Sequence, residues 1–88
     1  MKKIISIDRP FEMEKSFIVY EDGNKIDIAT YTVENRMEVL FALIEKHKVY
    51  QVDLVGPKKY MAGVKNQIEK AKMAKYENNN FELEINII

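Results

Sequence analysis

The 88-residue sequence contains no cysteine and no tryptophan, one histidine, three glycines and two prolines, and its formal net charge is zero. The lack of cysteine excludes disulfides and thiolate metal sites, which favours a reducing compartment. No apolar run approaches the roughly 20 residues that span a bilayer, and the run after the two N-terminal lysines is too short for a signal peptide. We therefore expect a cytoplasmic protein that makes no membrane contact.

What the chain does contain is typical of one folded domain, which we expect to span residues 1–88. Hydrophobic residues make up 47% of the sequence and charged residues 32%. A chain of this length buries only roughly 60–65% of its unfolded surface, so self-association would add stability. Charge is unevenly distributed: residues 46–75 carry a net +6, and the segments before and after them carry −3 each. The sequence therefore predicts a small, neutral but electrostatically polar domain.

The period of the apolar residues changes along the chain in the order β-β-β-α-β-α-β. The predicted strands cover residues 3–7, 16–20, 25–31, 49–55 and 81–88, and the predicted helices cover residues 35–48 and 58–76. Asn35 and Glu38 have the spacing of a capping box at the start of the first helix. The apolar stripes are expected at Met37, Leu40, Phe41 and Ile44 in the first helix and at Met61, Val64, Ile68 and Ala71 in the second.

Helices connect the third, fourth and fifth strands, which should therefore be parallel with right-handed crossovers. The simplest arrangement is a five-stranded mixed sheet of order 3-2-1-4-5 with both helices on one face, an α/β two-layer sandwich. Alternation in the outer strands agrees with one-sided cover, with Ile26 and Ile28 expected on the apolar face of the third strand and Asp27 on the polar face. The first two strands are apolar on both faces, which predicts an apolar centre on the bare face of the sheet.

The segment Ile5-Ser6-Ile7-Asp8 ends the first strand, and three antiparallel strands are then followed by α-β-α-β. In this motif and element order the whole chain resembles the ribonuclease H-like superfamily. The resemblance implies that Asp8 is a metal-binding carboxylate, joined by an acid on the first helix, where Glu38 and Glu45 are available. It also implies an acid at the end of the fourth strand, but Val55 to Lys58 contains none and Asp53 lies inside the strand. We therefore expect no metal, no cofactor and no catalytic residue.

Two basic sites are predicted from the residues themselves. Gly56-Pro57-Lys58-Lys59 joins the fourth strand to the second helix, so Gly56, Lys58 and Lys59, together with Arg9, are candidate anion-binding residues at a helix N-terminus. The same residues are also compatible with a plain turn that carries solvated lysines. The second helix is rich in lysine, and Lys65, Lys72 and Lys75 are candidate contacts for a protein or nucleic-acid partner, although a solvated helix face has the same composition.

His47, the single histidine, is interpreted as a favourable cation at the C-terminus of the first helix. The favoured function is a small, non-enzymatic binding module that acts as a homodimer and engages a protein or nucleic-acid partner. Two alternatives remain: a binder of a phosphorylated small molecule at the turn that begins with Gly56, and a reduced metal-dependent nuclease.

Overall fold

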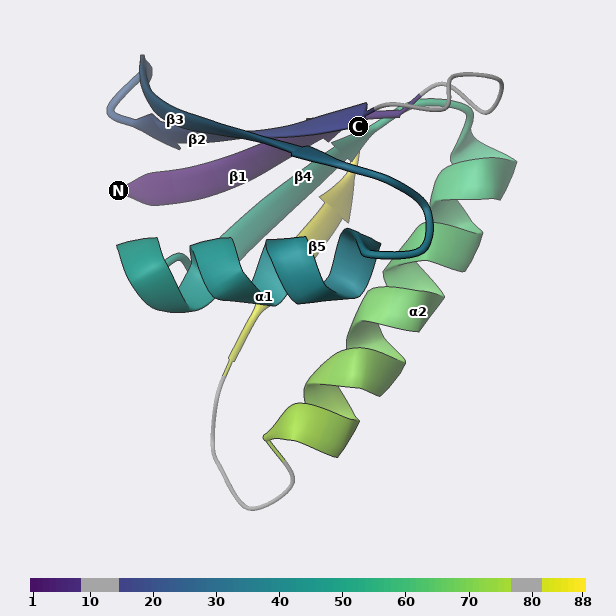
Figure 1. Cartoon of the computed structure of the whole chain (residues 1–88). Helices are drawn as coiled ribbons and strands as arrows, with labels where there is room; N and C mark the ends of the chain where they lie inside the picture. The colour runs from purple at the N-terminus through teal and green to yellow at the C-terminus, as the bar shows by residue number, and fades with distance from the viewer. Residues whose placement is uncertain (9–14, 77–81) are drawn as a thin grey trace.

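The computed structural model describes residues 1–8, 15–76 and 82–88, and its element order is the predicted one (Figure 1). The strands are β1 (Lys2–Ile7), β2 (Lys15–Glu21), β3 (Asn24–Tyr31), β4 (Gln51–Val55) and β5 (Glu84–Ile87). The helices are α1 (Arg36–His47) and α2 (Lys58–Lys75). No helix in these ranges is long and apolar enough to cross a membrane.

The strands form one sheet of order β3-β2-β1-β4-β5, which confirms the predicted topology. β1–β2 and β2–β3 are antiparallel, whereas β1–β4 and β4–β5 are parallel. Both helices lie on the same side of the sheet (Figure 1), as right-handed crossovers in one direction require. No element of the described chain covers the other side, which we call the open face.

Alternation along the strands places the core between the sheet and the helices. Ile4 of β1, Val19 of β2 and Val52 of β4 share one cross-strand row and are fully buried. The predicted stripes supply the helical side of this core: Leu40, Phe41, Ile44, Met61, Val64 and Ile68 are buried, while Met37 and Ala71 are partly buried against them. One-sided packing of two amphipathic helices therefore accounts for the core.

The N-terminus of α1 differs from the predicted capping box. Asn35 is the residue before the helix, but its side chain makes no cap hydrogen bond. The Asn35 Oδ1 instead accepts a hydrogen bond from the Thr32 backbone amide at 2.6 Å. The Asn35 side chain therefore closes the turn between β3 and α1 and does not cap the helix. Asn side chains readily form such local hydrogen bonds with the backbone of a turn.

The two faces of β3 are the reverse of the prediction. Ile28 lies on the open face and is 47% exposed, whereas Asp27 and Tyr31 lie toward the helices. Ile26 is 43% exposed and lies at a register shift between β2 and β3. Tyr31 is buried and stacks on Phe17, with ring centroids 4.0 Å apart. Because side chains alternate along a strand, burial of this large ring fixes the orientation of residues 27–31 and leaves Ile28 outside, up to the register shift that follows Asp27 toward the start of the strand.

The C-terminal strand is shorter than predicted. β5 begins at Glu84, and the expected start at Phe81 lies outside the described residues. Tyr50, inside the predicted fourth strand of residues 49–55, precedes β4 and is 56% exposed. The hairpin between β2 and β3 turns at Asp22 and Gly23, both at positive φ.

Asp27 ties the edge strand β3 to the end of α1. Its carboxylate accepts hydrogen bonds from the Ile28 backbone amide at 2.8 Å, from His47 Nε2 at 2.9 Å and from Lys46 Nζ at 3.4 Å. The hydrogen bond from His47 is the largest cause that holds the pKa of Asp27 below its ordinary value of 3.8. The ionised carboxylate also accepts a hydrogen bond from the Ile28 amide of β3. β3 is an edge strand, and its outer edge pairs with no described strand.

This linkage gives a pH-dependent prediction for Asp27→Asn. Because the folded-state pKa of Asp27 is depressed, its contribution to stability is present above the ordinary pKa and is lost as the pH falls through the folded-state value. We expect the variant to melt below the wild type at neutral pH and at the same temperature as the wild type in strong acid. Thermal melts of both proteins across this range test it, and a pH-independent difference would contradict it.

Candidate functional site

The chain that leaves β1 meets the turn between β4 and α2 at one edge of the sheet. The Asp8 amide donates to the Val55 carbonyl at 2.8 Å, which extends the parallel pairing of β1 with β4. Gly56 lies directly against Asp8: a Cβ at this glycine would be 2.5 Å from the Asp8 carbonyl oxygen and 3.0 Å from Met61 Sδ. Only glycine fits this approach of two backbones, so Gly56 has a structural reason to be present.

The Asp8 side chain is fully buried and is paired with two cations. Lys15, the first residue of β2, places its Nζ against Oδ1, and Arg36, the first residue of α1, donates from Nη2 to Oδ2 at 2.9 Å. The side chains of Lys15 and Arg36 are only 1% and 4% exposed. Two buried cations therefore surround one buried carboxylate, a costly arrangement that requires good geometry to persist.

Two tyrosines complete this polar cluster, which consists of Asp8, Lys15, Arg36, Tyr31 and Tyr60. Tyr60, in the first turn of α2, accepts hydrogen bonds from Lys15 Nζ at 3.1 Å and from Arg36 Nη2 at 3.2 Å. The Arg36 guanidinium also lies over the Tyr31 ring, 5.5 Å from its centroid. The Tyr31 hydroxyl is hydrogen-bonded to Ser6 Oγ at 3.0 Å. Residues from β1, β2, β3 and both helices thus meet at one point.

The pKa values of the cluster follow from this geometry. Burial lowers the pKa of Lys15, but hydrogen bonds to Asp8 and Tyr60 outweigh it and leave the pKa raised. Burial likewise acts against the Arg36 cation, and its contacts with Tyr60 and Asp8 leave its pKa raised. Hydrogen bonds from Arg36 and Lys15 lower the pKa of Tyr60, whereas burial raises that of Tyr31. Both cations therefore remain charged, and Tyr60 is the acidic tyrosine of the cluster.

The other acids that the resemblance offered do not converge on Asp8. Glu38 is exposed on α1, and Glu45 accepts hydrogen bonds from Tyr76 at 3.0 Å and pairs with Lys75 at 3.4 Å. Asp53 lies on the open face in register with Ile5. Within the described ranges no group of three or more His, Cys, Asp or Glu residues could hold a metal ion. Because Asp8 already carries two intramolecular cations, its carboxylate does not offer the open oxygens that a divalent ion needs.

Asp53 forms a second polar cluster, at the centre of the sheet. It is buried although it lies on the open face, because its carboxylate accepts hydrogen bonds from Gln51 Nε2 and Asn86 Nδ2, both at 3.1 Å, and pairs with Lys3 at 3.3 Å. Burial raises the pKa of Asp53, but these three partners outweigh burial and leave the pKa lowered. The β4–β5 half of the open face is therefore polar, and the polar side chains around Asp53 pair with one another.

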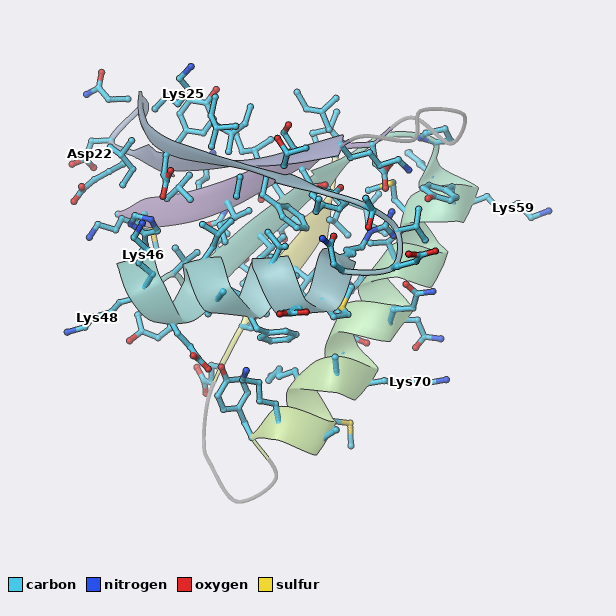
Figure 2. All side chains as sticks on the ribbon, viewed as in Figure 1. Asp22, Lys25, Lys46, Lys48, Lys59 and Lys70 are labelled. Carbon is cyan, nitrogen blue, oxygen red and sulfur yellow. The ribbon has the colours of Figure 1, made fainter. Side chains whose placement is uncertain are left out.

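The predicted anion-binding residues do not form a common site in the described chain. Lys58 and Lys59 are exposed at the start of α2, and Lys59 points away from the protein (Figure 2). Gly56 packs against Asp8 as described, and Arg9 lies outside the described residues. The anion site therefore stays a prediction with no convergent donors to support it.

The predicted partner-binding lysines of α2 differ in their surroundings. Lys58, Lys65 and Lys72 are spaced by seven residues, which places them along one side of the helix. Lys75 instead turns toward α1, where it pairs with Glu45 and lies over the Phe41 ring, 5.8 Å from its centroid. Lys70 projects from the outer surface (Figure 2). Lys65 and Lys72 thus remain candidates for a shared contact surface, while the placement of Lys75 is explained by its contacts within the domain.

The other half of the open face is apolar. Ile28, Ile18 and Ile5 form one continuous cross-strand row over β3, β2 and β1. Ile18 and Ile5 are half-buried by their neighbours, whereas Ile28 is 47% exposed and Ile7, one row further along β1, is 49% exposed. The apolar centre that the sequence predicted for the bare face is therefore present, and Ile28 extends it to the edge of the sheet.

Sequence reasoning missed the partners of Asp8. Neither Lys15 nor Arg36 nor Tyr60 was singled out from the sequence. A signal for Lys15 was present, because antiparallel pairing of Ser6 with Phe17 places position 15 opposite position 8. No comparable signal exists for Arg36 or Tyr60, since their meeting depends on how the two helices are packed on the sheet.

Comparisons with known proteins agree with the fold and go no further. No protein-family model matches the sequence, and no curated protein matches it. Among solved structures, the chain is similar to a protein from Bacteroides thetaiotaomicron described as having an actin-like ATPase fold and unknown function, with a TM-score of 0.67 and 16% identity. The similarity covers 99% of this chain but 32% of that protein, so the chain spans about a third of its length. The chain therefore shares its fold with part of an actin-like ATPase-fold protein.

Proposed function

We propose that this protein is a non-catalytic binding module that works as a homodimer, joined through the apolar half of its open face. The observation that carries the proposal is the row of isoleucines on β1, β2 and β3, which no described element covers. Contiguous exposed apolar surface on a small domain is typical of an association surface. A second copy is the occupant we propose, because closed two-fold association is the commonest form of assembly.

The non-catalytic part of the proposal rests on Asp8. The element order and the Ile5–Asp8 segment support placing this chain among ribonuclease H-like folds, in which Asp8 would be a metal-binding carboxylate. Here the same carboxylate is fully buried and neutralised by Lys15 and Arg36. A cluster that holds the strands and helices together has replaced a group that could bind a metal, so we infer that the domain contributes binding rather than chemistry.

The register of the sheet favours one geometry for the dimer. A two-fold axis along the Ile28–Ile18–Ile5 row would place each strand over the same strand of the partner, running in the opposite direction. The apolar half of each face would then meet the apolar half of the other, and the satisfied polar half around Asp53 would meet its own equivalent. The same axis keeps Lys3 and Lys25, at one end of the face, away from the same lysines of the partner. It places Asp53, which is in register with Ile5, opposite the same residue of the partner, and each of these carboxylates is paired with Lys3 of its own chain.

Light scattering at micromolar concentration tests this proposal with Ile28→Lys. We expect the wild type to have twice the 10.4 kDa mass of the chain, and the variant to be a monomer, because a lysine in the apolar row would lie against the apolar row of the partner without a polar partner. The fold should tolerate the change, since Ile28 is 47% exposed.

Met73→Lys is the matched control. Met73 is 72% exposed on α2, on the opposite side of the domain from the open face, so the same substitution should leave the dimer intact. A wild-type protein of 10.4 kDa throughout the concentration range, or equal dissociation by both variants, would overturn the proposed dimer.

A further inference from the structure

We propose that Tyr60 is a chemically activated tyrosine, a nucleophile and modification site for electrophilic phosphoryl or sulfonyl groups. The proposal is independent of the dimer and of the open face, because it concerns the polar cluster on the opposite side of the sheet. It is carried by the position of the Tyr60 hydroxyl between two cations.

Donor and acceptor chemistry fixes the role of the Tyr60 oxygen. Lysine and arginine side chains only donate hydrogen bonds, so this oxygen must accept from Lys15 at 3.1 Å and from Arg36 at 3.2 Å. Tyr60 is half-buried, and no acceptor for its phenolic proton is present among the described residues. Both hydrogen bonds strengthen when the proton leaves, because the acceptor then carries a negative charge.

The charge of the cluster points in the same direction. Lys15 and Arg36 together carry two positive charges, and among the described residues only the Asp8 carboxylate is ion-paired with them. A phenolate at Tyr60 would supply the second negative charge. On its own helix, the exposed Lys58 and Lys59 precede Tyr60 in the first turn, and their charges act in the same sense. A phosphoryl group on Tyr60 would likewise bring anionic oxygens to two cationic donors, which is why we assign this class of electrophile.

The reaction needs no group beyond the electrophile. The Tyr60 proton is released to solvent, and the phenolate oxygen attacks the sulfur of an aryl sulfonyl fluoride, which serves as the probe. An oxygen–sulfur bond forms, the sulfur–fluorine bond breaks, and fluoride leaves with the electron pair. Lys15 and Arg36 stay protonated throughout and stabilise the oxygen before the attack.

The experiment is competitive labelling of the whole chain, read by peptide mass spectrometry. Its internal standard is Tyr50, which at 56% exposed is more accessible than Tyr60. We expect Tyr60 to be labelled first and faster than Tyr50, and Tyr60→Phe to lose this fast-reacting label while Tyr50 still reacts. Labelling that follows exposure, with Tyr50 ahead of Tyr60, would overturn the proposal.

A second measurement shows whether fast labelling of Tyr60 is due to the neighbouring cations or to solvent exposure of its hydroxyl. Lys15→Met keeps the length of the side chain but removes one cation, so we expect slower labelling of Tyr60 in the folded variant. If that variant does not fold, absorbance titration of the phenols in the wild type and in Tyr60→Phe replaces it. The phenol missing from the Tyr60→Phe curve should be the one that ionises at the lowest pH, and the loss of any later phenol instead would refute the proposal.

Discussion

Replacing Asp8 by alanine is expected to lower the free energy of unfolding by about 3–5 kcal/mol in metal-free buffer. The substitution leaves two buried cations, Lys15 and Arg36, without the carboxylate that neutralises them. A domain of this size has a total stability near the low end of about 5–15 kcal/mol. The variant should therefore be close to unfolded at room temperature, and denaturant titration of the wild type and the variant measures the difference.

Two further variants identify the cause. Glu45→Ala removes a carboxylate that is 54% exposed and pairs with Lys75, so it should cost at most about 1 kcal/mol. The triple variant Asp8→Leu, Lys15→Met, Arg36→Met replaces the whole ion cluster by apolar side chains, and it should recover much of the stability that Asp8→Ala loses. A wild type that Mg²⁺ stabilises, together with an Asp8→Ala variant that is folded but unresponsive, would show that Asp8 is a metal ligand instead.

Gly56→Ala is expected to destabilise the protein by about 2–3 kcal/mol, since it forces atoms into a packed site. The new Cβ would lie 2.5 Å from the Asp8 carbonyl oxygen. That oxygen belongs to backbone that the Asp8–Val55 hydrogen bond holds in place, so it cannot move aside as a side chain could. For a domain of 60–100 residues, each kcal/mol shifts the melting temperature by about 4–8 °C, so thermal melts resolve the effect.

Gly63→Ala is the matched control, and it should have the opposite sign. Gly63 lies inside α2, and no atom stands within 4 Å of the position of its Cβ. The same substitution should therefore raise stability by about 0.5–1 kcal/mol, through the higher helix propensity of alanine. Two variants of equal stability would contradict the steric explanation for Gly56.

The sequence was sufficient to predict the sheet order and the placement of both helices, because these follow from element order and from the handedness of crossovers. It was misleading for β3, where Ile26 and Ile28 formed the more apolar set by composition. The deciding interaction was the stacking of Tyr31 on Phe17, which involves two strands and cannot be read from the alternation in one. Asn35 shows the same limit, since its side chain could cap a helix or close a turn.

The candidate site was harder to predict than the fold for a related reason. Asp8 was identified from a four-residue segment, but its meaning depends on Lys15 and Arg36, which lie 7 and 28 positions further along the chain. Charged residues such as these are usually exposed, and only the assembled layers show that they are buried. The chemistry of a buried carboxylate is determined by its neighbours in space, which a single sequence does not specify.

The central pairing of β1 with β4 also constrains the order in which the chain assembles. β2 and β3 are joined by a two-residue turn, so their contacts are local and can form early. The pairing of β1 with β4 brings residue 4 next to residue 52. Closing the long loop between them costs conformational entropy, which opposes this pairing until many of its contacts have formed. We expect the β1–β4 pairing to be the last part of the sheet to form, so that an early folding species would still display the β4 edge of β1 to the solvent.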